Sequence, residues 1–133
     1  MNINFQIAPI PTDSIYSKSQ FETSGIPIVE WSAPSEGTYY TLLCVDPDAL
    51  EPDWLHWLAV NCRGANPGTG TTLAAWEPPT PPSGTHKYNF TLYSHSAPVK
   101  MEPPVARSNF DTAAFVKANG LTRISQTVIR VKA

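Results

Sequence analysis

The stretch CVDPDALEPDWLHWLAV, residues 44–60, holds the ends of two apolar runs on either side of a turn that prolines break. The first run covers residues 39–45 and is bounded by Asp46 and Pro47, and the second covers residues 56–62. Apolar, aromatic-rich runs of this length between turn formers are typical of buried β-strands. We therefore expect two strands that pair antiparallel across the loop 47–55.

Strand-like patterns continue towards the C-terminus. TTLAAW (71–76) is a short strand candidate, HKYNFTLYS (86–94) alternates, and the tail RISQTVIRVKA (123–133) has an apolar pattern of strand type. Alternation places one set of side chains on the face towards the core: His86, Tyr88, Phe90 and Leu92. The chain has 14 prolines in 133 residues, and EPPTPPSGT (77–85) must be an extended loop because proline is excluded from helices and central strands.

One helix is predicted, in SNFDTAAFVKANG (108–120). Ser108 is the expected N-cap, with Asp111 as the capping-box acid three residues later. Lys117 lies in the expected last turn, and Asn119 with Gly120 provides the stop. The sequence therefore predicts a mainly β fold with a small helix near its C-terminus.

Composition bounds the class of protein. The length of 133 residues suits one domain, 1–133, and the net charge of -2 without a Lys/Arg-rich run argues against nucleic acid as a partner. No stretch offers the roughly 20 apolar residues that span a bilayer, and the N-terminus lacks a signal-peptide pattern. Cys44 and Cys62 lie in apolar runs, which favours buried, reduced thiols. We expect a soluble cytoplasmic protein with no integral membrane association.

Ionisable side chains are expected to gather at one rim of the sheet. With up-and-down strand order, Asp46 ends one strand and His56 begins the next at the same edge, and the loop 77–85 returns there before His86 and Tyr88. Imidazoles and a phenol suit a phosphate or carboxylate, and a neighbouring acid raises a histidine pKa. We expect an anionic guest that carries its own hydrogen-bond donor, because the acid would repel a bare anion.

Several neighbouring residues have a structural interpretation instead. Asp48 is expected to bond backbone amides of its own turn, Trp54 and Trp57 to pack in the core or at the rim, and Lys87 to be solvated. His95, on the opposite strand face from His86, is assigned no role.

The order of three motifs nevertheless resembles a known family. YTLLCVDPDAL, HWLAVN and PPTPPSGTHKYNFTLY resemble the signature regions of the phosphatidylethanolamine-binding proteins, also called Raf kinase inhibitor-like proteins, from about Ile26 onward. The resemblance implies a sandwich of two antiparallel sheets with one or two small peripheral helices, in a compact member with a shortened loop before His56. It also implies a ligand pocket formed by Asp46, His56, Pro82, His86 and Tyr88, supported at its rim by Asp48, Trp54 and Pro81.

The chain departs from the family pattern at several positions. Leu50 replaces the proline of the D-P-D-A-P turn, Trp76 and Pro78 replace the aromatic residue and the glycine of Y-x-G-P, and Lys87 replaces an arginine. Pro78 cannot adopt the positive φ that glycine permits, and Lys87 lacks the planar guanidinium. The first three changes bear on the shape of the pocket.

Three functions compete on this sequence. The leading one is non-catalytic binding of anionic head groups or phosphorylated partner segments, with modulation of a kinase or other signalling protein. A second is a protease or kinase inhibitor that acts through its surface and has a vestigial pocket. A third is a hydrolase that uses His56 or His86 with Asp46, although no nucleophile-elbow pattern is present. No cofactor or metal is expected, but a zinc site from Asp46, His56 and His86 is the metal-dependent variant.

Overall fold

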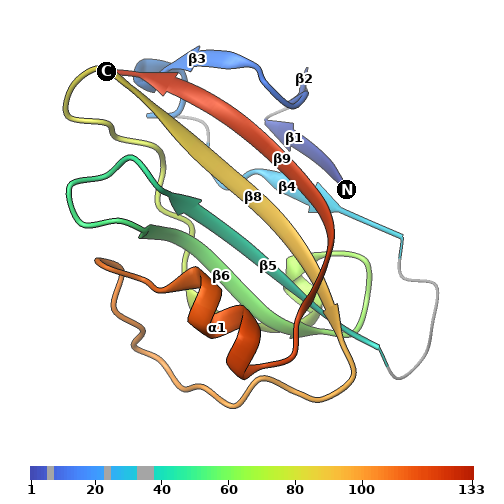
Figure 1. Cartoon of the computed structure of the whole chain (residues 1–133). Coiled ribbons are helices and arrows are strands. Elements are labelled where there is room, and N and C mark those ends of the chain that lie inside the picture. Colours follow the sequence, from blue (N-terminus) through green and yellow to red (C-terminus); the bar gives the residue numbers. More distant parts are fainter. Residues whose placement is uncertain (6–7, 23–24, 33–37) are drawn as a thin grey trace.

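The computed structural model describes residues 1–5, 8–22, 25–32 and 38–133. A six-stranded sheet has the order β3 (Ile15–Ser17), β9 (Thr122–Lys132), β8 (Thr85–His95), β5 (Tyr39–Asp46), β6 (Trp54–Cys62) and β7 (Thr71–Ala74). A second sheet has the order β2 (Ala8–Pro9), β1 (Asn2–Phe5) and β4 (Ile28–Glu30). Two short 3₁₀ turns, η1 (Lys18–Gln20) and η2 (Pro67–Thr69), and the helix α1 (Thr112–Ala118) complete the described elements. Figure 1 shows this arrangement.

The predicted two-sheet, mainly β fold is confirmed, with two differences in strand pairing. β8 pairs with β5 and not with the preceding β7, so the proline loop passes across the ends of β6 and β5 to reach β8. β3 pairs with β9 in parallel, whereas the other strand pairs among the described residues are antiparallel. β5 takes a central position because seven of its eight residues are buried, which requires cover on both faces.

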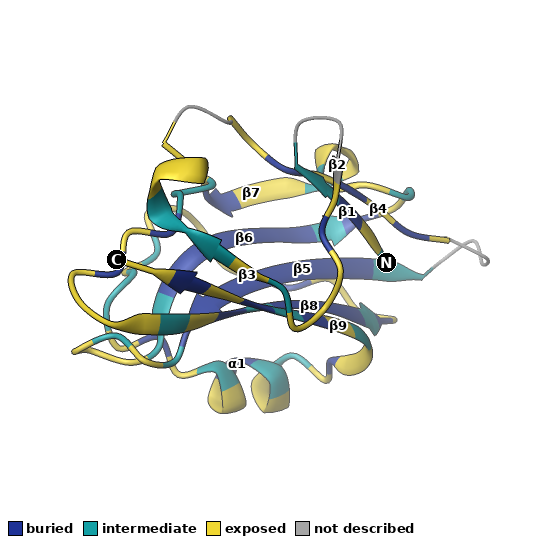
Figure 2. Ribbon diagram, turned by 90° about the horizontal axis from the view of Figure 1, so that it is seen from above, coloured by how far each residue is buried: buried dark blue, intermediate teal, exposed yellow. Residues whose placement is uncertain are grey.

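Two apolar clusters lie on the two faces of the large sheet. Leu42, Cys44, Phe90 and Ile129 belong to the cluster beneath the small sheet. Leu43, Val45, Tyr93 and Phe115 belong to the cluster beneath α1. Figure 2 shows the large sheet between the small sheet and α1, with β5 and β6 almost wholly buried. Strand alternation therefore divides β5 between two cores.

The predicted alternation of β8 holds for its inward set. Tyr88, Phe90 and Leu92 are buried in the cluster beneath the small sheet. On the opposite face Lys87 is exposed, but Thr91 and Tyr93 are buried because the other cluster covers that end of the strand. Cys44 and Cys62 are buried free thiols, as predicted.

The predicted helix start is wrong by three residues. α1 begins at Thr112, and Asp111 is its N-cap, since the Asp111 carboxylate accepts a hydrogen bond from the Ala114 amide at 3.0 Å. The preceding residues pair with another segment: Asn109 N–H donates to the Glu51 carbonyl at 3.0 Å, and Phe110 and Asp53 exchange two backbone hydrogen bonds. These bonds hold the backbone outside the helix, so Ser108 is not a cap.

Candidate functional site

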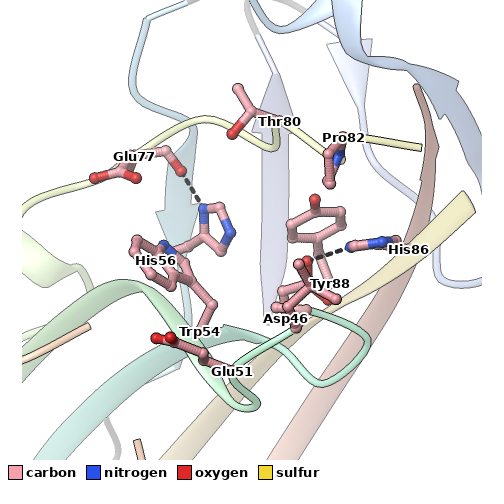
Figure 3. A pocket seen from close by; sticks show the side chains of 11 residues that line it. Asp46, Glu51, Trp54, His56, Glu77, Thr80, Pro82, His86 and Tyr88 are labelled. Carbon is pink, nitrogen blue, oxygen red and sulfur yellow. Dashed lines mark hydrogen bonds and ion pairs between the residues drawn. The ribbon is translucent and has the colours of Figure 1, made fainter. Parts of the chain in front are cut away.

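A cavity of about 430 Å³ opens at the rim where β5 ends and where β6 and β8 begin (Figure 3). The loop that follows β5 forms one wall, and the proline loop before β8 forms the other. The lining residues are Asp46, Ala49, Leu50, Glu51, Trp54, His56, Glu77, Thr80, Pro82, His86 and Tyr88. The shared rim that strand order predicted is therefore present.

Asp46 lies at the base of this cavity and is only 3% exposed. One carboxylate oxygen accepts a hydrogen bond from His86 Nδ1 at 2.7 Å, and the other accepts one from the Asp48 amide at 2.8 Å. The His86 ring and the amide of the turn after β5 therefore bond the two oxygens of one buried carboxylate and fix its position. Burial of a carboxylate is tolerated when it is bonded in this way.

His56 faces Asp46 across the cavity (Figure 3). Its Nδ1–H donates to the Glu77 carbonyl at 2.6 Å, and its ring meets Tyr88 edge to face with 5.0 Å between centroids. Because Nδ1 carries the proton, the neutral ring leaves Nε2 as an acceptor. Burial lowers the pKa of His56, although the hydrogen bond to Glu77 and the charge of Asp46 act in the opposite direction.

This direction corrects the sequence prediction for His56. The neighbouring acid was expected to raise the histidine pKa, but desolvation of the ring exceeds that effect. Tyr88 stays a phenol for a related reason: burial raises its pKa, and the charge of Asp46 raises it further. Tyr88 is therefore a hydrogen-bond donor in the site at every physiological pH.

The structure brings together most of the residues that the sequence singled out. The five predicted ligand-binding residues and Trp54 all line the cavity, whereas Pro81 is buried outside its lining. Asp48 also lies outside the lining. Its carboxylate accepts the Lys87 amide of β8 at 2.8 Å and does not bond its own turn, so the predicted turn role belongs to the Asp46 carboxylate.

The departures from the family pattern leave the cavity open. Leu50 is 95% exposed at its mouth. Trp76 turns away from it and packs against Trp57 and Phe90, with ring centroids at 5.6 and 5.9 Å. The aromatic side chain therefore fills space between the sheets.

Sequence reasoning missed several residues of the site. Glu51, Glu77 and Thr80 line the cavity, and Glu77 orients His56 through its backbone. Arg107 supports the wall from behind: its guanidinium donates to the Leu55 carbonyl at 2.9 Å and to the Ala75 carbonyl at 2.8 Å and pairs with the Glu77 carboxylate at 3.3 Å. The position of Glu77 at the start of the predicted rim loop was a usable signal, but no local pattern marks Arg107.

The alternative of a zinc site needs a group of metal ligands. In the described ranges, no three or more His, Cys, Asp or Glu side chains form a group that could hold a metal ion. Ser83 and Thr85, the hydroxyls near His86 in sequence, line a separate hollow and not this cavity.

The family model for phosphatidylethanolamine-binding protein matches residues 6–129. The chain belongs to this family. A 26 kDa secreted antigen of Toxocara canis is 40% identical over 104 residues, which cover 67% of this chain and 39% of the antigen. The chain thus spans well under half of the length of that antigen. A cytoplasmic location for this chain stays a prediction.

Two solved structures share the fold of this chain. A carboxypeptidase Y inhibitor complexed with its cognate proteinase has a TM-score of 0.80 at 14% identity, covering 99% of this chain and 82% of the inhibitor. The phosphatidylethanolamine-binding protein of Plasmodium vivax has a TM-score of 0.75 at 17% identity, covering 98% and 83% of the two chains. As for membrane insertion, the described residues contain no helix with the length and apolar character to cross a bilayer.

Proposed function

We propose that this chain is a non-catalytic binding module whose Asp46 cavity captures a phosphate-type head group, from a small molecule or a phospholipid. The observation that carries the proposal is the convergence of His56 Nε2, the His86 ring and the Tyr88 hydroxyl on one cavity of about 430 Å³. Membership of the phosphatidylethanolamine-binding protein family supports it. Modulation of a kinase or another signalling partner is the extension that we expect from such capture.

The charges around the cavity favour a ligand with a cation of its own. Asp46, Glu51 and Glu77 all line it, and Asp46 lies within hydrogen-bond distance of His86. A bare anion meets these carboxylates, whereas an ammonium group on the ligand is attracted by them. O-Phosphorylethanolamine should therefore bind more tightly than inorganic phosphate.

The test is a titration followed by two-dimensional NMR. Phosphate, O-phosphorylethanolamine and phosphotyrosine are added to the wild type and to Asp46→Ala and His56→Ala variants. For O-phosphorylethanolamine, either variant should weaken binding about tenfold to a hundredfold, because His56→Ala removes a partner of the phosphate and Asp46→Ala removes a carboxylate that attracts the ammonium group. Asp111→Ala is the matched control, since it removes a carboxylate at the helix N-terminus outside the cavity lining.

The outcome separates this proposal from its competitor. Shifts confined to the cavity residues and lost in both variants would support the binding module. If a partner protein is captured equally well by the Asp46→Ala and His56→Ala variants, the working surface lies elsewhere and an inhibitor that acts through its surface becomes the better explanation. Millimolar ligand without any shift in the wild type would have the same consequence.

A further inference from the structure

Two positive side chains lie directly opposite each other beside the cavity. Lys87 of β8 and Arg130 of β9 are partners in the antiparallel register, and both are exposed. Figure 1 shows these strands side by side at the end of the sheet that also holds the C-terminus. Cross-strand partners point to the same face of a sheet, so the two charged groups share one surface.

Backbone hydrogen bonds show that this is the closer kind of cross-strand pair. The Lys87 N–H donates to the Asp48 carboxylate at 2.8 Å, and the Arg130 N–H donates to the Ser14 carbonyl at 2.9 Å. Neither amide therefore points at the opposite residue, which defines a non-hydrogen-bonded pair, with side chains closer than in a hydrogen-bonded pair. Like charges in this position destabilise a sheet.

No acid in the described part of the chain neutralises the pair. The ion pairs found there are His86 with Asp46 and Arg107 with Glu77, so neither Lys87 nor Arg130 has a carboxylate partner within salt-bridge distance. Lys132 is the partner of Thr85 in the register, two residues along the same strand face, and adds a third exposed positive charge. Among the described residues, the only carboxylate beside the pair is that of Asp48, which accepts the Lys87 amide and forms no ion pair with either cation, so the repulsion is offset only in part.

The pair borders a hollow of about 560 Å³ that is distinct from the Asp46 cavity. The turn 83–85, His86, Lys87, Arg130 and Asp48 line this hollow. The hydroxyls of Ser83 and Thr85 add hydrogen-bond donors, and two cations face the single carboxylate of Asp48. His86 is the one residue that lines both the hollow and the cavity.

We propose that this hollow is a second anion site, which takes a phosphate-type oxyanion between Lys87 and Arg130. Such an anion accepts charge-assisted hydrogen bonds from both side chains and relieves their repulsion. The site is separate from the cavity of the proposed function and does not require that cavity to be occupied.

The first part of the test measures stability without ligand. Lys87→Gln and Arg130→Gln each remove one of the repelling charges, so the midpoint of thermal unfolding in phosphate-free buffer should rise or stay level. Lys100→Gln is the matched control, because Lys100 is exposed on the connection after β8 and lies in the lining of neither hollow nor cavity. Added phosphate should raise the midpoint of the wild type more than those of Lys87→Gln and Arg130→Gln.

The second part measures binding and its source. Inorganic phosphate should shift the amide signals of Gly84, Thr85 and Lys87, and each glutamine variant should bind about fivefold more weakly, as expected for a partly exposed charge pair. Sedimentation with vesicles of phosphatidylcholine and phosphatidylglycerol distinguishes the sources. Co-sedimentation that Lys87→Gln abolishes assigns the site to lipid phosphate, and a response to soluble phosphate alone assigns it to a free anion.

Failure of this site is distinguishable from failure of the cavity. Shifts at Gly84, Thr85 and Lys87 that persist in an Asp46→Ala variant support the second site whatever happens in the cavity. The proposal is overturned if millimolar phosphate and anionic vesicles leave these signals unchanged, or if Lys87→Gln and Arg130→Gln respond as strongly as Lys100→Gln.

Discussion

At the scale of single residues, His56 decides how the site responds to pH. Burial lowers its pKa, so the ring is neutral in the free protein near pH 7, with Nδ1–H bonded to the Glu77 carbonyl. An anionic oxygen placed against Nε2 is bonded there only when the ring carries a second proton. Ligand capture and proton uptake are consequently linked at this residue.

Affinity should therefore rise as pH falls towards the lowered pKa of His56. Sulfate is the informative probe, because its charge stays constant across the range. We expect tighter sulfate binding at about pH 5.5 than at about pH 8 in the wild type, two values on either side of the unperturbed histidine pKa of about 6.5. The difference should be smaller in His56→Gln. Isothermal titration calorimetry in two buffers of different ionisation enthalpy measures the proton uptake directly, and equal heats in both buffers would contradict the linkage.

The same pKa direction predicts the opposite trend for stability. The unfolded chain binds a proton at His56 more readily than the folded chain, so the free energy of unfolding falls as pH drops below about 6.5 and through the lowered pKa. Above that range the contribution is fully present. Urea unfolding at a series of pH values should show a shallower decline in His56→Gln, whose amide can still donate to Glu77. Equal slopes for the two proteins would rule out this role of His56.

At the scale of elements, the helix start is set by contacts far away in sequence. Asp111→Ala should lower the free energy of unfolding by about 1 kcal/mol, because it removes the side-chain acceptor of the Ala114 amide. Ser108→Ala should change it by less than about 0.5 kcal/mol. Urea denaturation of the two variants measures the difference, and the reverse ranking would restore Ser108 as the cap.

What the sequence can predict at this scale follows from how local the signal is. Asp46, His56, His86 and Tyr88 could be placed together because they lie at strand ends and antiparallel order brings those ends to one rim. The choice between Ser108 and Asp111 could not be made locally, since both are good caps and the pairing of residues 109–110 with residues 51–53 decides it.

Side-chain partners across strands were equally beyond local reasoning. The spacing of D-P-D does not tell which carboxylate closes the turn, and only the approach of β8 gives Asp48 the Lys87 amide as its partner. The parallel pairing of β3 with β9 also depends on a contact between the two ends of the chain. Such long-range pairings carry no periodic signal in the sequence.

At the scale of the whole molecule, β5 couples the two apolar clusters. Its alternate residues Leu42 and Cys44 face one cluster, and Leu43 and Val45 face the other. Loss of packing in either cluster would expose one face of β5. We therefore expect the chain to unfold as one cooperative unit, which is also the prediction of a single domain.

Cooperative unfolding is checked by comparing two signals during urea denaturation. Three of the four tryptophans, Trp31, Trp57 and Trp76, lie in or pack against the cluster beneath the small sheet, so tryptophan fluorescence reports chiefly on that cluster. Fluorescence and far-ultraviolet circular dichroism should give one midpoint. Phe115→Ala lies in the other cluster and should lower that common midpoint, with a loss of about 3 kcal/mol in the free energy of unfolding. Two separate transitions in the variant would show that the layers unfold independently.

Arg107 has a further consequence at this scale. It belongs to the connection that leads into α1, yet its guanidinium bonds the carbonyls of Leu55, His56 and Ala75 at 2.9, 3.3 and 2.8 Å. One side chain thus ties the connection before α1 to the start of β6 and to the segment that follows β7, beside the cavity. We therefore expect a ligand that holds the cavity wall in place also to restrict the connection that leads into α1, through this one side chain.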